Sequence, residues 1–146
     1  MKMAVKPIAE GNEGNLGVIK VPIGQFSRSM PAAATVNVKP GYLYKDNGSG
    51  ALVLAAAGDG RGVVEGTPEF NLDNSLGAAP TDKQVTVVRK GPVRLVASGA
   101  ITAKALIIAD NNGKVQTIGK GTFDLVLGSA VTDAVNDGDA IDAYLE

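Results

Sequence analysis

The sequence predicts a mainly β fold, a small β-barrel or β-sandwich of short strands with an extended N-terminal arm. Nineteen of the 146 residues are glycine, which indicates many turns, because a glycine inside a regular element costs about 0.5–1 kcal/mol relative to alanine. In residues 91–115, valine, leucine and isoleucine alternate with small or polar residues, as half-buried strands require. With three phenylalanines, three tyrosines and no tryptophan, the core is expected to be filled by small side chains.

Residues 1–34 form the least regular section. Glycine and proline recur there too often for a long helix or strand, although residues 16–23 are compatible with one short edge strand. Two interpretations stay open: an edge strand of the same domain, or an extended arm that orders against a neighbouring subunit or another protein. The arm hypothesis makes the apolar side chains of this section candidate contact residues: Val5, Ile8, Leu16, Val18, Ile23 and Phe26.

A regular pattern of short strands and turns begins at residue 35, and residues 35–146 form the predicted β-rich domain. In chain order it has an alternating run at residues 35–39, a Pro40-Gly41 turn, strands at residues 42–44 and 51–54, and a turn at residues 46–50 between them. Residues 42–48 echo residues 106–113, which fits either a duplicated β unit or two independent hairpins with the same favoured turn. Residues 58–84 break this pattern and predict a long loop between two β halves.

After this loop the pattern predicts short strands joined by tight turns. Ser98-Gly99 and residues 111–113 are expected to supply the positive φ angles that such turns need. Residues 129–136 are compatible with one helical turn, because Thr132 or Ser129 is a suitable N-cap.

The last predicted strand covers residues 140–145. Because successive side chains of a strand point to opposite faces, Ile141, Ala143 and Leu145 share one face of it. We expect that face to be buried.

The inventory of catalytic side chains is small. The chain contains no histidine and no cysteine, so the usual general base at neutral pH and the thiol nucleophile are absent. An EF-hand loop begun at Asp133 would place Val135 at a ligand position, and the glycine-rich residues 58–62 and 119–122 miss the phosphate-binding spacings. We therefore expect no enzyme activity, no metal and no cofactor, and interpret the aspartates near the C-terminus as parts of a polar turn: Asp133, Asp137, Asp139 and Asp142.

The net charge and the hydropathy of the sequence argue against two classes of partner, nucleic acid and membranes. Fourteen basic and fifteen acidic residues leave a net charge of −1, so no global field attracts nucleic acid. The longest apolar run, residues 51–57, is far shorter than the roughly 20 residues that span a bilayer, and the first residues lack the apolar core of a signal peptide. We expect no nucleic-acid partner, no membrane partner and no export by a signal peptide.

Tyr42 and Tyr44 stand two residues apart and are expected on one face of a strand. Such a pair is compatible with an aromatic platform for a sugar or a single-stranded nucleic acid. Since only Lys39 and Lys45 lie nearby in the sequence, we favour a packed or interface surface.

The second half of the chain resembles a known family. Its elements follow one another in this order: a strand, Ser-Gly-Ala-Ile at residues 98–101, a strand, Asp-Asn-Asn-Gly-Lys-Val at residues 110–115, a strand, Leu-Gly-Ser-Ala at residues 127–130 and Asp-Gly-Asp-Ala-Ile at residues 137–141. This order is similar to that of the small β-rich capsid decoration, or cement, proteins of tailed bacteriophages, of the lambda-like head decoration type. The resemblance covers residues 84–146. One departure is that Lys104-Ala105 stands where the family has glycine and an acidic residue.

The resemblance implies a noncatalytic structural protein of the virion. Such a protein is made in the host cytoplasm, binds the outer surface of the expanded capsid and stabilises it by bridging subunits of the major capsid protein. It also implies self-association, as a homotrimer at threefold positions or a dimer at twofold positions. Two other classes stay open: a carbohydrate-binding or adhesin-like β module, which the absence of tryptophan disfavours, and a carboxylate-dependent hydrolase.

Overall fold

The described part of the chain is mainly β, as predicted. The computed structural model describes residues 26–33, 36–69, 84–119 and 123–146, and for Phe26 the backbone alone. Its strands are β1 (Phe26–Pro31), β2 (Tyr44–Asp46), β3 (Leu52–Leu54), β4 (Val64–Pro68), β5 (Gln84–Val96), β6 (Leu106–Ala109), β7 (Val115–Thr117), β8 (Gly128–Ala130) and β9 (Ala140–Leu145). Residues 1–25 of the predicted arm, with the strand expected at residues 16–23, lie outside the described residues, whereas residues 26–31 of the same section form β1.

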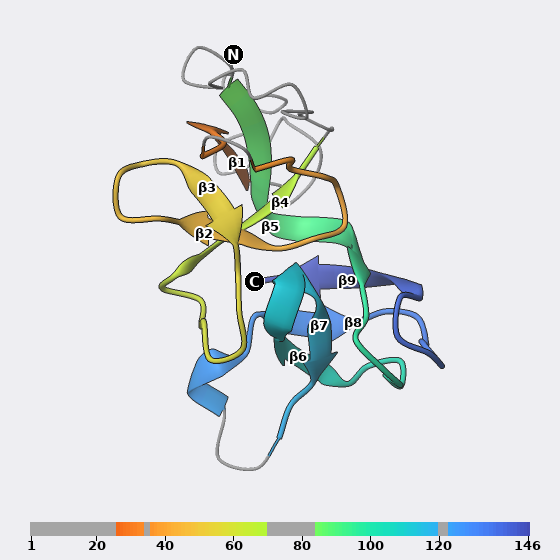
Figure 1. The fold of residues 1–146 in the computed structure, drawn as a ribbon. Coiled ribbons are helices and arrows are strands. Elements are labelled where there is room, and N and C mark those ends of the chain that lie inside the picture. Colours follow the sequence, from red (N-terminus) through yellow and green to blue (C-terminus); the bar gives the residue numbers. More distant parts are fainter. Residues whose placement is uncertain (1–25, 34–35, 70–83, 120–122) are drawn as a thin grey trace, which may run out of the picture.

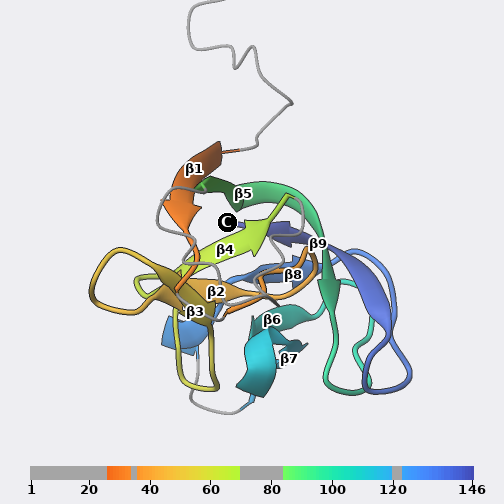
Figure 2. The same cartoon turned by 45° about the horizontal axis from the view of Figure 1, so that its top comes forward.

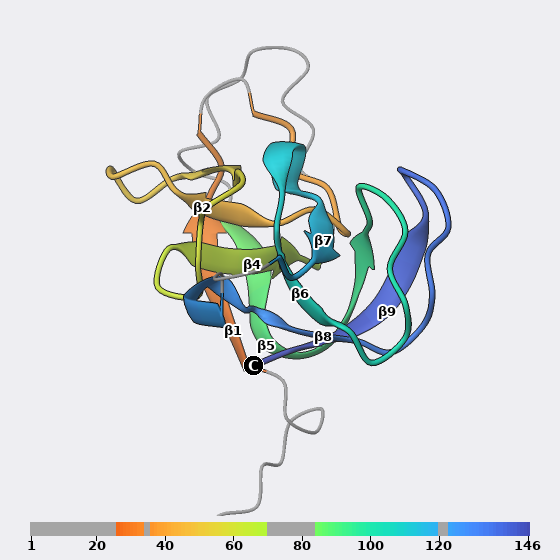
Figure 3. The ribbon, with the colours of Figure 1, turned by 90° about the horizontal axis from the view of Figure 1, so that it is seen from below.

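The strands form one sheet with the order β3-β2-β4-β5-β9-β8-β6-β7, and β1 pairs with β5. The ladders between these strands are antiparallel. The sheet curls into a half-barrel (Figures 1 and 3). A bridge between Ala97 and Val115 joins the chain after β5 to β7, and the Ser98 amide donates to the Val115 carbonyl at 2.9 Å. This bridge closes the part of the sheet that runs from β5 through β9, β8 and β6 to β7.

The central strand β5 connects two layers of the molecule. Its first half lies between β1 and β4, and its second half, from Gly91 to Val96, pairs with β9 (Figure 2). Gly91 has a φ of 112°, a conformation that glycine adopts without steric cost. The strand therefore changes direction at Gly91 without ending, and residues 84–96 form one long strand where the sequence predicted only short ones.

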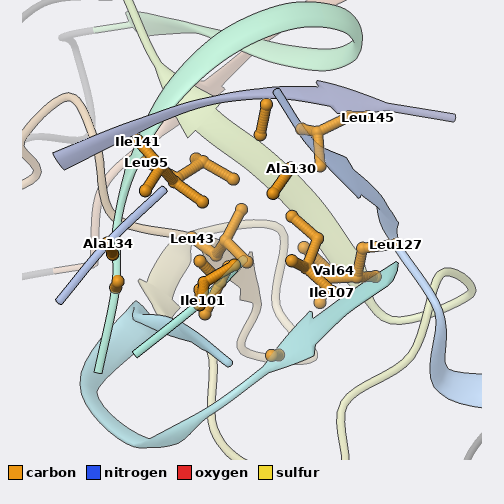
Figure 4. Packing of buried hydrophobic residues seen from close by; sticks show 14 of the residues in the cluster. Leu43, Val64, Leu95, Ile101, Ile107, Leu127, Ala130, Ala134, Ile141 and Leu145 are labelled. Carbon is orange, nitrogen blue, oxygen red and sulfur yellow. The ribbon is translucent and has the colours of Figure 1, made fainter. Parts of the chain in front are cut away.

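Two clusters of buried side chains follow from this arrangement. The larger one lies inside the curled sheet, between β5, β6, β7, β8 and β9 (Figure 4), and six of its fifteen buried members are alanine. The smaller one packs Met30, Tyr44 and Val85 between β1, β2 and β5. The alanines confirm the prediction of a core with many small side chains.

The final strand is found where the alternation placed it. Residues Ile141, Ala143 and Leu145 of β9 are each at most 3% exposed, whereas Ala140 and Tyr144 are exposed. Strand β9 pairs with β5 on one side and β8 on the other. Its position inside the ladder explains why one face is fully covered.

The prediction of an unbroken loop at residues 58–84 is wrong in part, because β4 lies within it. Gly66 and Pro68 are residues typical of turns, and they led to the prediction of a loop. In the structure Gly66, with a φ of 131°, instead lies where β4 approaches the carbonyl of Val88. Only a residue without Cβ permits that approach. The glycine therefore marks an irregularity inside a strand.

The helical turn considered at residues 129–136 does not form. Ser129 belongs to β8, and Ala134 forms a bridge with Ile101. The Asp139 carboxylate accepts hydrogen bonds from the amides of Val135 and Asn136, at 3.0 and 2.9 Å. These side-chain acceptors satisfy the backbone donors and stabilise an irregular turn in place of a helix.

The echoing segments both form hairpins, β2–β3 and β6–β7, as either interpretation of the echo requires. In the second hairpin Asn112 and Gly113 have φ angles of 62° and 71°, as expected for the turn, while Gly99 has no positive φ and corrects the expectation for Ser98-Gly99. The short 3-10 helices η3 (Asn111–Gly113) and η4 (Phe123–Leu125) complete the fold. No helix among the described residues is long and apolar enough to cross a membrane.

Lys104 occupies the position where the sequence departs from the decoration-protein pattern, and it has a φ of 74°. A left-handed conformation costs a non-glycine residue about 1–2 kcal/mol, while glycine pays about 0.5–1 kcal/mol in chain entropy. We expect Lys104→Gly to raise the free energy of unfolding by about 0.5–1 kcal/mol, measured by urea denaturation. Lys104→Ala keeps the unfavourable φ and serves as the control; an equal gain in that variant would contradict the argument.

Candidate functional site

Most of the predicted contact residues fall outside the part of the chain that the structure describes. Val5, Ile8, Leu16, Val18 and Ile23 lie in residues 1–25, of which nothing is described. Phe26 is the first residue of β1 and stands opposite Lys90 of β5. The pairing of β1 with β5 attaches the segment after residue 25 to the sheet.

The tyrosine pair is a packing feature. Tyr44 is 1% exposed, and its hydroxyl donates to the Asn37 carbonyl at 3.3 Å and accepts from the Lys39 amide at 3.1 Å. Burial raises the pKa of the Tyr44 phenol above its ordinary value. Since the Tyr44 ring is covered, it and the half-buried Tyr42 do not form an open stacking platform. The two rings instead line a cavity of about 360 Å³ with Asn37, Lys39, Leu54, Asn112 and Lys114.

The four aspartates near the C-terminus each have a structural partner. Asp133 accepts from the Ala103 amide at 2.6 Å, and Asp137 pairs with Lys114 at 2.7 Å. The hydrogen bond to Asp137 raises the pKa of the Lys114 ammonium.

The other two aspartates are held in the same way. Hydrogen bonds from the amides of Asn136 and Val135 lower the pKa of the Asp139 carboxyl. The carboxylate of Asp142 accepts from Arg94 Nε at 2.8 Å, which raises the pKa of that guanidinium. Among the described residues, no three acidic, histidine or cysteine side chains gather into a possible metal site.

A second cavity, of about 350 Å³, lies where β4 and β5 meet the end of β9. Its lining combines three cationic side chains with apolar ones: Arg61, Arg89, Lys90, Val64, Leu127, Leu145 and Glu146. We call it the basic cavity. The sequence offered no signal for it except the adjacent Arg89 and Lys90, because the fold brings Arg61 and Glu146 to β5 from distant parts of the chain.

Large apolar side chains also stand exposed on the surface. The most exposed are Phe123 and Val135, each 72% exposed, followed by Val131 at 57%. On the outer face of the sheet, Leu106, Ser129, Tyr144 and Pro92 are register partners across β6, β8, β9 and β5. Leu106 and Tyr144 are 37% and 40% exposed, so this strip is partly apolar.

Comparison with known proteins gives a match in structure only. No protein-family model matches the sequence, and no curated protein sequence matches it. The fold is similar to the crystal structure of the N base of the head fiber gp8.5 of bacteriophage phi29, with a TM-score of 0.59. The two chains share a fold. The similarity covers 83% of this chain and 95% of that chain at 18% sequence identity.

Proposed function

We propose that this protein is a noncatalytic structural component of a phage virion that binds the outer surface of the expanded capsid. The observation that carries the proposal is the shared fold, because the similarity extends over nearly the whole base of a phage head fiber. The resemblance of residues 84–146 to capsid decoration proteins supports the same class of function.

The chemistry of the described surface is compatible with this function. The carboxylates near the C-terminus hold turns and ion pairs, and apolar side chains such as Phe123 and Val135 are exposed. Exposed apolar groups of this kind favour contact with another protein surface.

In the proposed role each copy binds two neighbouring capsid subunits and bridges them. Separation of two subunits then also requires the loss of the contacts that the bridging copy makes. A ligand that binds only the assembled state stabilises that state by an amount that rises with the logarithm of its concentration divided by its dissociation constant. A homotrimer at threefold positions fits this role, with a dimer at twofold positions as the alternative.

We expect the purified protein to sediment with expanded capsids of its phage and to raise the temperature at which those capsids break open. A chain that lacks residues 1–25 should bind more weakly, because the candidate contact residues Val5 to Ile23 are removed while β1 is kept. Binding is measured by cosedimentation and capsid disruption by light scattering.

Circular dichroism of the truncated chain provides the control for folding. A full-length protein that stays in the supernatant at all concentrations would rule out the proposed function. Equal binding by the two chains would instead remove the contact role of residues 1–25 and leave the capsid role in place.

A further inference from the structure

The basic cavity concentrates positive charge in a chain whose net charge is −1. Its lining contains three cationic side chains, Arg61, Arg89 and Lys90, and one acidic side chain, Glu146. The two arginines are accessible to solvent, since their side chains are 58% and 45% exposed. An anion from outside can therefore reach both guanidinium groups.

The ion pairs of these arginines within the chain are long. Arg61 Nη2 lies 3.9 Å from Glu146 Oε1, and Arg89 Nε lies 3.6 Å from Glu65 Oε1. Both distances exceed the usual hydrogen-bond range of about 2.7–3.2 Å. Glu65 is held more closely by Arg28, at 3.1 Å. Because a guanidinium has five N–H donors in a planar fork, these pairs leave donors for a second carboxylate.

Three further lining side chains are apolar and packed into the core. Val64, Leu127 and Leu145 are each at most 8% exposed and belong to the larger core cluster (Figure 4). The cavity borders one end of that cluster beside the arginines. Its volume of about 350 Å³ lies within the range of about 300–1,000 Å³ of small-ligand pockets. A fitting occupant carries a carboxylate next to an apolar group.

We propose that the basic cavity is the docking site for an acidic peptide segment of the capsid protein, in which glutamate or aspartate side chains alternate with apolar ones. This inference rests on the proposed function for the identity of the partner, whereas the chemistry of the segment follows from the lining alone. The carboxylates bind Arg61 and Arg89, and the apolar side chains cover Val64, Leu127 and Leu145. Nucleic acid is a poorer occupant, because a phosphate backbone offers nothing to the apolar side of the cavity.

The test uses a fluorescent, end-capped peptide of alternating leucine and glutamate, with its binding followed by fluorescence polarisation. The variant Arg61→Glu/Arg89→Glu should weaken binding at least about tenfold, since hydrogen bonds to charged groups contribute most to such contacts. Arg94→Glu is the matched control: Arg94 lies on the same strand as Arg89, is exposed, and pairs with Asp142 away from the cavity. It should change the affinity less than about twofold.

Two further arms make the outcome decisive. A peptide with glutamine in place of glutamate should bind wild type as weakly as the glutamate peptide binds the double variant. A single-stranded oligonucleotide that binds more tightly than the peptide, and loses affinity in the same variant, would assign the cavity to phosphate and overturn the proposal. Equal peptide affinity in wild type and double variant, or no binding to wild type, would overturn it as well. If the double variant does not fold, Arg61→Ala, in an exposed turn, takes its place with the same expectations.

Cosedimentation with capsids separates this inference from the proposed function. If wild type and the double variant bind capsids equally, the cavity is not the docking site and the capsid role stands. If wild type does not bind capsids, the proposed function fails, and the peptide assay still decides whether the cavity accepts acidic segments.

Discussion

Ile141→Asp is expected to abolish stable folding. Ile141 is 1% exposed, is the second residue of β9 and pairs with Leu95 of β5 inside the larger core cluster. An aspartate there buries a carboxylate among apolar side chains at a cost of several kcal/mol, in addition to the lost burial of the isoleucine. Since domains are stable by about 5–15 kcal/mol, this loss is comparable to the whole free energy of unfolding. Circular dichroism and thermal melts measure it.

The neighbouring residue provides the control. Asp142 points to the other face of β9 and pairs with Arg94 on the surface, where the two side chains are 46% and 72% exposed. Asp142→Asn should leave the unfolding midpoint almost unchanged, because exposed ion pairs contribute little to stability. A cooperative melt of Ile141→Asp near the wild-type temperature would show that β9 is not a core strand.

The contrast between β9 and β4 shows how much of the fold the sequence predicts. Strand β9 follows from a local pattern, the alternation of residues 140–145, and the two hairpins follow from the turn residues at positions 46–50 and 111–113. The sequence therefore predicts these elements. Strand β4 depends on a long-range approach to β5 that no local pattern records. Gly66 signals a turn by propensity and serves instead as a point of contact.

The candidate site was less predictable for the same reason. The arginines of the basic cavity lie on the turn before β4 and on β5, and Glu146 follows β9. Their proximity depends on the pairing of β5 with both β4 and β9. Of the contact residues that the sequence suggested, only Phe26 has a described position. The sequence predicted strands and the absence of common catalytic side chains, and the tertiary pairing was needed to find a cavity.

Gly66→Ala is expected to be the most destabilising of the glycine substitutions in this chain that the structure allows us to compare. A Cβ at Gly66 would overlap the carbonyl oxygen of Val88 and lie 2.7 Å from its carbonyl carbon. The φ of 131° at Gly66 is also unfavourable for alanine. Overpacking costs about 1–3 kcal/mol and a positive φ about 1–2 kcal/mol, so we expect a loss of about 3 kcal/mol or more in the free energy of unfolding.

Three other glycines separate the two causes. Gly58 has a φ of 93° and open space around its Cβ position, so Gly58→Ala should lose only the conformational part, about 1–2 kcal/mol. A Cβ at Gly128 would overlap the carbonyl of Tyr144 without a positive φ, so Gly128→Ala should lose about 1–3 kcal/mol through packing alone. Gly99 has neither feature, and Gly99→Ala should be neutral within about 0.5 kcal/mol.

Urea denaturation of the four variants therefore tests the register of β4 directly. If Gly66→Ala costs no more than Gly58→Ala, β4 does not approach Val88 as the structure has it. The consequence extends to the proposed docking site, because β4 begins with Val64 of the cavity lining and carries Glu65, the partner of Arg28 and Arg89. A Gly66→Ala variant that remains folded but has a shifted β4 should therefore bind the acidic peptide more weakly. Gly128→Ala, at the same loss of stability, should weaken peptide binding only if the Tyr144–Leu145 end of β9 moves as well.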